Sequence, residues 1–125
     1  MNIFLKRVYE PFDEADGCRV LVDRLWPRGV SKVEARLDFW VKDAAPSSGL
    51  RKWFGHKPEL FDEFRSRYLD ELRTNEPQIQ AVKQIMDLAE KGRVTLLHGA
   101  KDPVHNHAVV LYEELERVIS QQNNG

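Results

Sequence analysis

The chain has 125 residues, a length that is typical of one domain with a core of its own. Hydrophobic residues make up 42% and charged residues 31%, and the net charge of −1 argues against the basic excess that nucleic-acid and membrane binders carry. The single cysteine, Cys18, excludes an internal disulfide and a cysteine-based zinc cluster, and no apolar run approaches membrane-spanning length. We therefore expect a cytoplasmic protein that has no membrane partner.

The first half of the chain predicts two strands followed by short helices. Residues 2–9 and 19–23 are the expected strands, and the unbroken aliphatic run in the second is typical of a strand covered on both faces. A capping box predicts a helix over residues 32–37. Residues 37–45 are expected to cover apolar surface, and a short helical turn is expected over residues 48–54.

The second half predicts three helices and one strand. Helices commonly open with a proline and end at a glycine, a pattern that predicts helices over residues 58–73 and 77–92. An apolar run predicts a strand over residues 93–98. Asp102 precedes a proline and indicates an N-cap, so the last helix is expected over residues 103–121.

Strands that alternate with helices predict a small α/β sandwich, a single domain over residues 1–121 with a mostly parallel central sheet flanked by helices. Residues 122–125 are expected to form a disordered polar tail. In such sheets ligands bind beyond the carboxyl ends of the strands. We therefore expect the loops at residues 23–29 and 98–107 to meet at one edge of the sheet and to form a site.

The loop at residues 23–29, Asp-Arg-Leu-Trp-Pro-Arg-Gly, carries large side chains where loops usually carry small polar ones. The guanidinium forks of Arg24 and Arg28 match carboxylate and phosphate groups, and Arg7 and Arg51 are further candidates for the same ligand. The alternative is that these arginines pair with nearby carboxylates and only fasten the loops.

Candidates for proton transfer and ligand contact surround this loop. Asp23 ends a buried strand and is a candidate catalytic base, with His105 as the second catalytic candidate near neutral pH. Amides at the start of the last helix favour an anion, and Lys101 and Asn106 beside them are candidate ligand-binding residues. Trp26 could flank a planar ligand. The alternatives are structural: Asp23 would bind a loop amide or an arginine, and Trp26 would pack.

Three histidines near the last strand, His98, His105 and His107, suggest a metal site, but their spacing argues against one. On a helix, His105 and His107 would lie about 200° apart around the axis and could not share a face. A turn could still bring His98 close to Asp102, which leaves that pair open. We expect no bound metal and no cofactor.

The function that these residues favour is binding of a small anionic molecule that bears a phosphate or carboxylate, with hydrolase or transferase activity left open. The alternative is a non-catalytic nucleic-acid-binding or regulatory module, because basic side chains interleave with a tryptophan over residues 24–32, as in single-strand binders. A third hypothesis is self-association through the same loop, since tryptophan and arginine are also favoured at protein interfaces.

The chain carries several distinctive short sequence motifs, spread over nearly its whole length. They are the heptapeptide at 23–29, Ala-Pro-Ser at 45–47, Leu-Arg-Lys-Trp-Phe-Gly-His at 50–56, Phe64 with Tyr68, Glu71-Leu72, Val-Thr-Leu-Leu at 94–97, Ala-Lys-Asp at 100–102 and His105-Asn106. Together they resemble the YeaO-like branch of a bacterial domain-of-unknown-function family, number 488. The resemblance implies a single cytoplasmic α/β domain with no established activity. Relatives in another branch carry Cys-His-Arg where this chain has His105-Asn106-His107, so the resemblance implies no thiol chemistry here.

Overall fold

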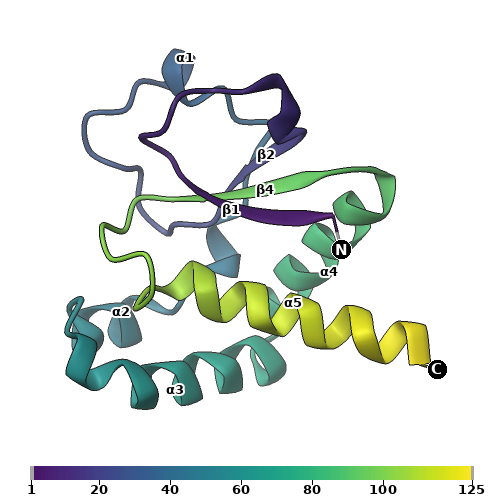
Figure 1. Ribbon diagram of the computed structural model, residues 1–125. Coiled ribbons are helices and arrows are strands. Elements are labelled where there is room, and N and C mark those ends of the chain that lie inside the picture. The colour runs from purple at the N-terminus through teal and green to yellow at the C-terminus, as the bar shows by residue number, and fades with distance from the viewer. Residues whose placement is uncertain (1, 125) are drawn as a thin grey trace.

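A computed structural model describes residues 2–124, in which four strands form one parallel sheet (Figure 1). The strands are β1 (Ile3–Arg7), β2 (Cys18–Leu21), β3 (Phe39–Trp40) and β4 (Val94–His98), and their order across the sheet is β1-β4-β2-β3. Every neighbouring pair is parallel. The predicted α/β fold, with a mostly parallel sheet flanked by helices, is therefore confirmed.

The helices of the described residues are α1 (Lys32–Ala35), α2 (Ser48–Phe54), α3 (Phe61–Thr74), α4 (Glu76–Lys91) and α5 (His107–Asn124). The side chains of Ser31 and Ser47 accept hydrogen bonds from backbone amides and cap α1 and α2, as expected for serine before a helix. None of the helices within residues 2–124 is long and apolar enough to cross a membrane.

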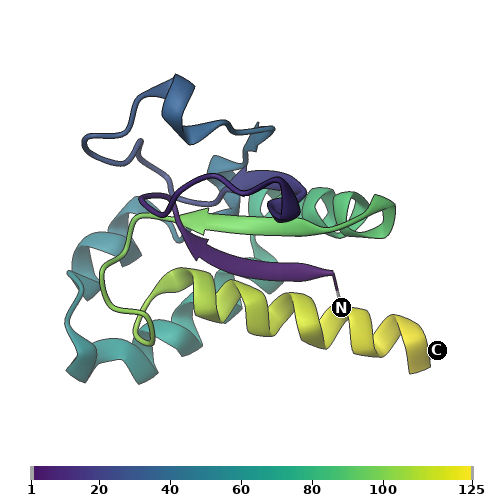
Figure 2. The ribbon, with the colours of Figure 1, turned by 45° about the horizontal axis from the view of Figure 1, so that its top comes forward.

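The two faces of the sheet are covered differently. α4 and α5 contact β4, α5 also contacts β1, and α3 packs against both of these helices. The loop that carries α1 lies on the opposite side of the sheet from α3 and α5 (Figure 2). A small apolar cluster packs on that side and consists of Val8, Leu21, Leu97, Trp26, Val30, Leu37 and Trp40. The carboxyl ends of the strands thus lie between a helical layer and a loop layer.

The structure adds one strand and lengthens the last helix. The sequence predicts no strand at Phe39–Trp40, because two residues are too few to show an alternating pattern, yet they pair with Val20 and Leu21. α5 runs to Asn124 and so includes most of the segment that the sequence predicts as a disordered tail.

The predicted start of the last helix is wrong. The Asp102 carboxylate accepts hydrogen bonds from the amides of Val104 and His105, but this contact closes a turn and does not begin a helix. α5 begins at His107, after Asn106, whose side-chain oxygen accepts a hydrogen bond from an amide in the first turn. Both Asp102 and Asn106 are good capping residues, and the second one is used for the helix.

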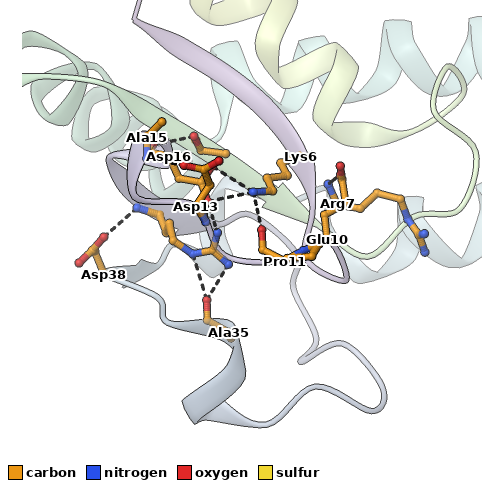
Figure 3. Close-up of polar contacts among 11 residues, drawn as sticks. Lys6, Arg7, Glu10, Pro11, Asp13, Ala15, Asp16, Ala35 and Asp38 are labelled. Carbon is orange, nitrogen blue, oxygen red and sulfur yellow. Dashed lines mark hydrogen bonds and ion pairs between the residues drawn. The ribbon is translucent and has the colours of Figure 1, made fainter.

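A buried ion pair fixes the amino end of β2. Arg19 is only 1% exposed, and its guanidinium binds the Asp16 carboxylate and the Ala35 carbonyl. Lys6 of β1 approaches the same carboxylate to 3.0 Å (Figure 3). Burial acts to raise the pKa of Asp16, but hydrogen bonds from Lys6, a backbone amide and Arg19 lower it overall. The pair of Asp16 and Arg19 therefore joins β1, β2 and the end of α1.

Replacing Asp16 by asparagine (Asp16→Asn) would leave the buried guanidinium of Arg19 without its carboxylate. We expect the free energy of unfolding to fall by about 3–5 kcal/mol, because an unpaired charge then stays inside the protein. Urea unfolding followed by circular dichroism measures the loss. The matched control is Asp87→Asn on the exposed side of α4, which we expect to stay within about 0.5 kcal/mol of the parent. Equal stability of the two variants would contradict the role given to Asp16.

Candidate functional site

A cavity of about 300 Å³ opens where β1, β2 and β4 end. Its walls come from Tyr9 after β1, residues 23–28 after β2, residues 45–46 before α2, α2 itself with His56 after it, Phe64 of α3, and the segment from the end of β4 to the start of α5. The prediction that the loops at 23–29 and 98–107 meet at one edge of the sheet is therefore confirmed. The side chains that join those loops decide the shape of the cavity.

Asp23 is the main contact between the two loops. Its Oδ2 atom accepts a hydrogen bond of 2.9 Å from the amide of Gly99, and its Oδ1 atom lies 2.9 Å from Nε2 of His107. The second contact is close enough for an ion pair but is not aligned as a hydrogen bond. The backbone carbonyl of Asp23 also accepts a hydrogen bond from the indole of Trp40. Asp23 is thus engaged with three separate segments.

Gly99 allows this close approach because it has no side chain. A Cβ atom at this position would lie only 3.1 Å from Oδ2 of Asp23 and 3.6 Å from the ring of Pro27. A larger residue would push the Asp23 carboxylate away from the backbone amide whose hydrogen bond it accepts. Glycine at the exit of β4 is therefore a packing requirement of the site.

Three arginines reach the cavity, and their surroundings differ. Arg24 donates hydrogen bonds to the carbonyls of Pro46 and Ala45, at 3.0 and 3.1 Å, and so fastens the wall before α2. Arg51 lines the cavity from α2, and its buried Nε atom has no hydrogen-bond partner among the described residues. Arg28 is exposed at the rim. Of these three arginines, Arg24 is a structural clamp that also lies 3.6 Å from the Asp43 carboxylate, as the alternative of a loop-fastening arginine predicts. Arg28 and Arg51 have no carboxylate partner within residues 2–124.

A polar network, which the sequence does not reveal, holds the wall at residues 44–47. The Glu71 carboxylate accepts hydrogen bonds from the Ser47 amide and hydroxyl, at 2.9 and 2.6 Å. The side chain of Gln78, which is buried, donates to Glu71 and to the carbonyl of Ala45. Tyr68 donates to the carbonyl of Ala44. α3 and α4 thereby position one side of the cavity without contributing these polar side chains to its lining.

The rest of the lining is mostly apolar. Trp26 packs its ring edge against Trp40, with centroids 5.2 Å apart, and its indole donates a hydrogen bond to the carbonyl of Val30. Phe54 and Phe64, which also line the cavity, stack on each other with centroids 4.2 Å apart. These rings are held by the protein itself, so they form fixed surfaces.

Other candidates lie outside the cavity or serve the fold. Arg7 donates to the carbonyl of Ala100 at 2.9 Å, and Lys101 is exposed; neither lines the cavity. Asn106 lines it, but its amide group donates to the carbonyl of Asp102 and its oxygen caps α5. Of these three predicted ligand-binding residues, Arg7 and Asn106 form hydrogen bonds with the backbone, and Arg7 and Lys101 lie outside the cavity.

His105 is separated from Asp23 by the turn before α5. Its Nδ1 atom lies 2.9 Å from the Asp102 carboxylate, and its ring packs edge-on against Phe61. Hydrogen bonds from the His105 amide, a second amide and the His105 ring lower the pKa of Asp102 to about 2. The histidine beside Asp23 is His107, which the sequence suggests only as a candidate metal ligand.

His98 is a buried histidine at the end of β4. It is 5% exposed, its Nδ1 atom has no hydrogen-bond partner among the described residues, and its ring lies 6.4 Å from that of His107. Burial, followed by the nearby His107, lowers the pKa of His98 to about 4. Within residues 2–124 no three histidine, cysteine, aspartate or glutamate side chains are grouped as a metal site would require.

Comparison with known proteins gives consistent matches over nearly the full chain. A family model described as "Inactive DUF488-N3 subclade" matches residues 2–125. The Escherichia coli protein YeaO, labelled uncharacterised, is 47% identical over 115 residues, which cover 92% of this chain and 97% of that protein. Uncharacterised proteins of Mycobacterium bovis and Mycobacterium tuberculosis are each 44% identical over 114 residues, covering 91% of this chain and 93% of theirs. No solved structure matches the chain at a significant level.

His98 makes the stability of the fold depend on pH. Its pKa of about 4 in the folded protein lies below the ordinary value of 6.5, so the unfolded chain binds the proton more readily. Acidification from pH 7 to 4 should therefore lower the free energy of unfolding by up to about 3 kcal/mol, and this effect should end below pH 4. Urea unfolding at intervals across this range measures the loss.

The variant His98→Gln cannot take up this proton. Its stability at pH 7 can differ from that of the parent, but the part of the pH dependence that His98 causes should be missing between pH 7 and 4. The remaining histidines are common to both proteins and cancel in the comparison. An identical pH dependence of parent and variant would contradict the assignment.

Proposed function

We propose that this chain, which belongs to the DUF488 family, binds a small anionic molecule in the cavity at the strand ends and does not transform it. The proposal rests on the side chain of Arg51. It lines the cavity, its Nε atom is buried, and no partner satisfies that atom among the described residues. A buried donor without a partner is costly, and an anion in the cavity would satisfy the guanidinium group.

The balance of charge around the cavity supports an anion. Arg24, Arg28 and Arg51 line it, and the only carboxylate among the lining residues is that of Asp23. Outside the lining, the Asp43 carboxylate lies 3.6 Å from the Arg24 guanidinium, so the surplus positive charge comes from Arg28 and Arg51. Asp23 already contacts the Gly99 amide and His107, so its charge is partly compensated by the protein. A ligand therefore meets a net positive surface, which favours a phosphate or a carboxylate.

The lining residues favour binding over catalysis. No serine, threonine or cysteine is among them, and the only hydroxyl group, that of Tyr9, donates to the carbonyl of Arg28. The two catalytic candidates, Asp23 and His105, contact different partners on different segments. The word "Inactive" in the description of the matching family model agrees with a protein that binds without reaction.

A hydrolase or transferase remains the second candidate because of one observation, the contact between Asp23 and His107. The Asp23 carboxylate lies 2.9 Å from the imidazole of His107, and a carboxylate at this distance can orient a histidine that acts as a general base. The nucleic-acid hypothesis has less support, because Trp26 packs against Trp40 and its indole donates a hydrogen bond to the carbonyl of Val30. A ring fixed in this way has less freedom to stack on successive bases.

The variant Arg51→Gln tests the anion site. Inorganic phosphate, titrated at constant ionic strength, should raise the melting temperature of the parent protein by mass action. Loss of the guanidinium group should weaken phosphate binding by about ten- to a hundredfold, the size of one charge-assisted hydrogen bond. Because Arg51 makes no ion pair within residues 2–124, the variant should fold like the parent.

Arg65→Gln is the matched control, since Arg65 is an exposed arginine of α3 outside the cavity. It should bind phosphate as the parent does. Phosphate binding that Arg51→Gln leaves unchanged would contradict the anion site. Hydrolysis of p-nitrophenyl phosphate that Asp23→Asn abolishes would contradict a purely binding role and would favour the second candidate.

A further inference from the structure

We infer that the ligand of this cavity is an aromatic anion, a single ring that carries a carboxylate or phosphate directly or through a short link. The inference rests on the proposed anion site and adds the chemistry of the rest of the ligand. Three features of the cavity lead to it: its volume, the character of its walls, and the position of Arg51 and Phe54 on one face of α2.

The cavity is larger than a simple anion needs. Its volume of about 300 Å³ is at the lower end of the range of small-molecule sites. A phosphate or acetate ion would fill only part of it, so a well-matched ligand has a body attached to its charged group.

The walls favour an apolar, flat body. Trp26, Pro27, Pro46, Phe54 and Phe64 line the cavity with rings. Phe54 and Phe64 are fixed by stacking on each other, and the indole of Trp26 is fixed by its hydrogen bond and its contact with Trp40. The faces of these rings offer no hydrogen-bond partners to hydroxyl groups, whose burial without hydrogen bonds is costly, so a sugar packed against them is disfavoured. An aromatic ring gains contact on each wall.

The cation and one aromatic wall come from the same helix. Arg51 and Phe54 are three residues apart on α2, so they lie on the same face of this helix. Both line the cavity. A ligand that binds Arg51 through its charged group therefore meets Phe54 in the same cavity, and a ring attached close to the charged group suits this arrangement. Aryl carboxylates and aryl phosphates have that structure.

Paired probes test the inference by isothermal titration calorimetry. Phenyl phosphate is compared with inorganic phosphate, and benzoate with acetate, at constant pH and ionic strength. We expect each aromatic probe to bind at least tenfold more tightly than its partner, because the ring buries apolar surface that the simple ion lacks. The stronger of the two aromatic probes identifies the charged group that the cavity prefers.

The matched variants replace one exposed apolar residue each by serine. Leu25 lines the rim and is 60% exposed, whereas Val33 of α1 is 83% exposed and lies outside the cavity, so neither change should affect folding. Leu25→Ser should reduce the advantage of phenyl phosphate over phosphate, taken as the ratio of the two dissociation constants, by roughly three- to fivefold. Val33→Ser should leave the advantage unchanged.

The outcomes separate this inference from the proposed function. Equal binding of phosphate and phenyl phosphate, with a loss of both in Arg51→Gln, would overturn the aromatic ligand and keep the anion site. An advantage of phenyl phosphate that Leu25→Ser does not reduce would also count against a ring in this cavity. Absence of binding by all four probes, or binding that Arg51→Gln leaves unchanged, would overturn both.

Discussion

The arrangement of the site depends on the Asp23 carboxylate. It is 17% exposed, and a charge so far removed from water must be met by polar partners. Those partners are the amide of Gly99 after β4 and the ring of His107 at the start of α5, so one side chain connects the ends of two strands and a helix. The cavity exists because this connection holds the loop at residues 23–29 beside the segment that leads into α5.

The sheet could be predicted from the sequence because its central strands are continuous apolar runs bounded by turn residues. The runs around Val20 and Leu96 must be covered on both faces, and only a parallel sheet between two layers does that. The start of α5 could not be predicted, since Asp102 and Asn106 are equally suited to cap a helix. The choice between them depends on tertiary packing, which local preference does not contain. β3 is too short to leave a pattern.

The candidate site was predictable in its location and only partly in its residues. Arg24, Arg28 and Arg51 were identified by the character of their side chains, and all three line the cavity. The sequence could not show that Arg24 would bind the carbonyls of a loop 21 and 22 residues further on, or that Gln78 and Glu71 would hold that loop. Such roles follow from contacts between distant segments. For the same reason, His107 and not His105 faces Asp23.

The strand order has a consequence for the synthesis of the protein. β4 lies between β1 and β2, which pair with it and not with each other, so Ile3 and Cys18 both align with Val94. β1 therefore has no partner strand, and β2 has only the two-residue β3, until the chain has grown past residue 98. The apolar side chains that β4 covers stay exposed during that interval, which is when nascent chains are most prone to aggregate. The sheet closes late, and this protein folds after most of it has been made.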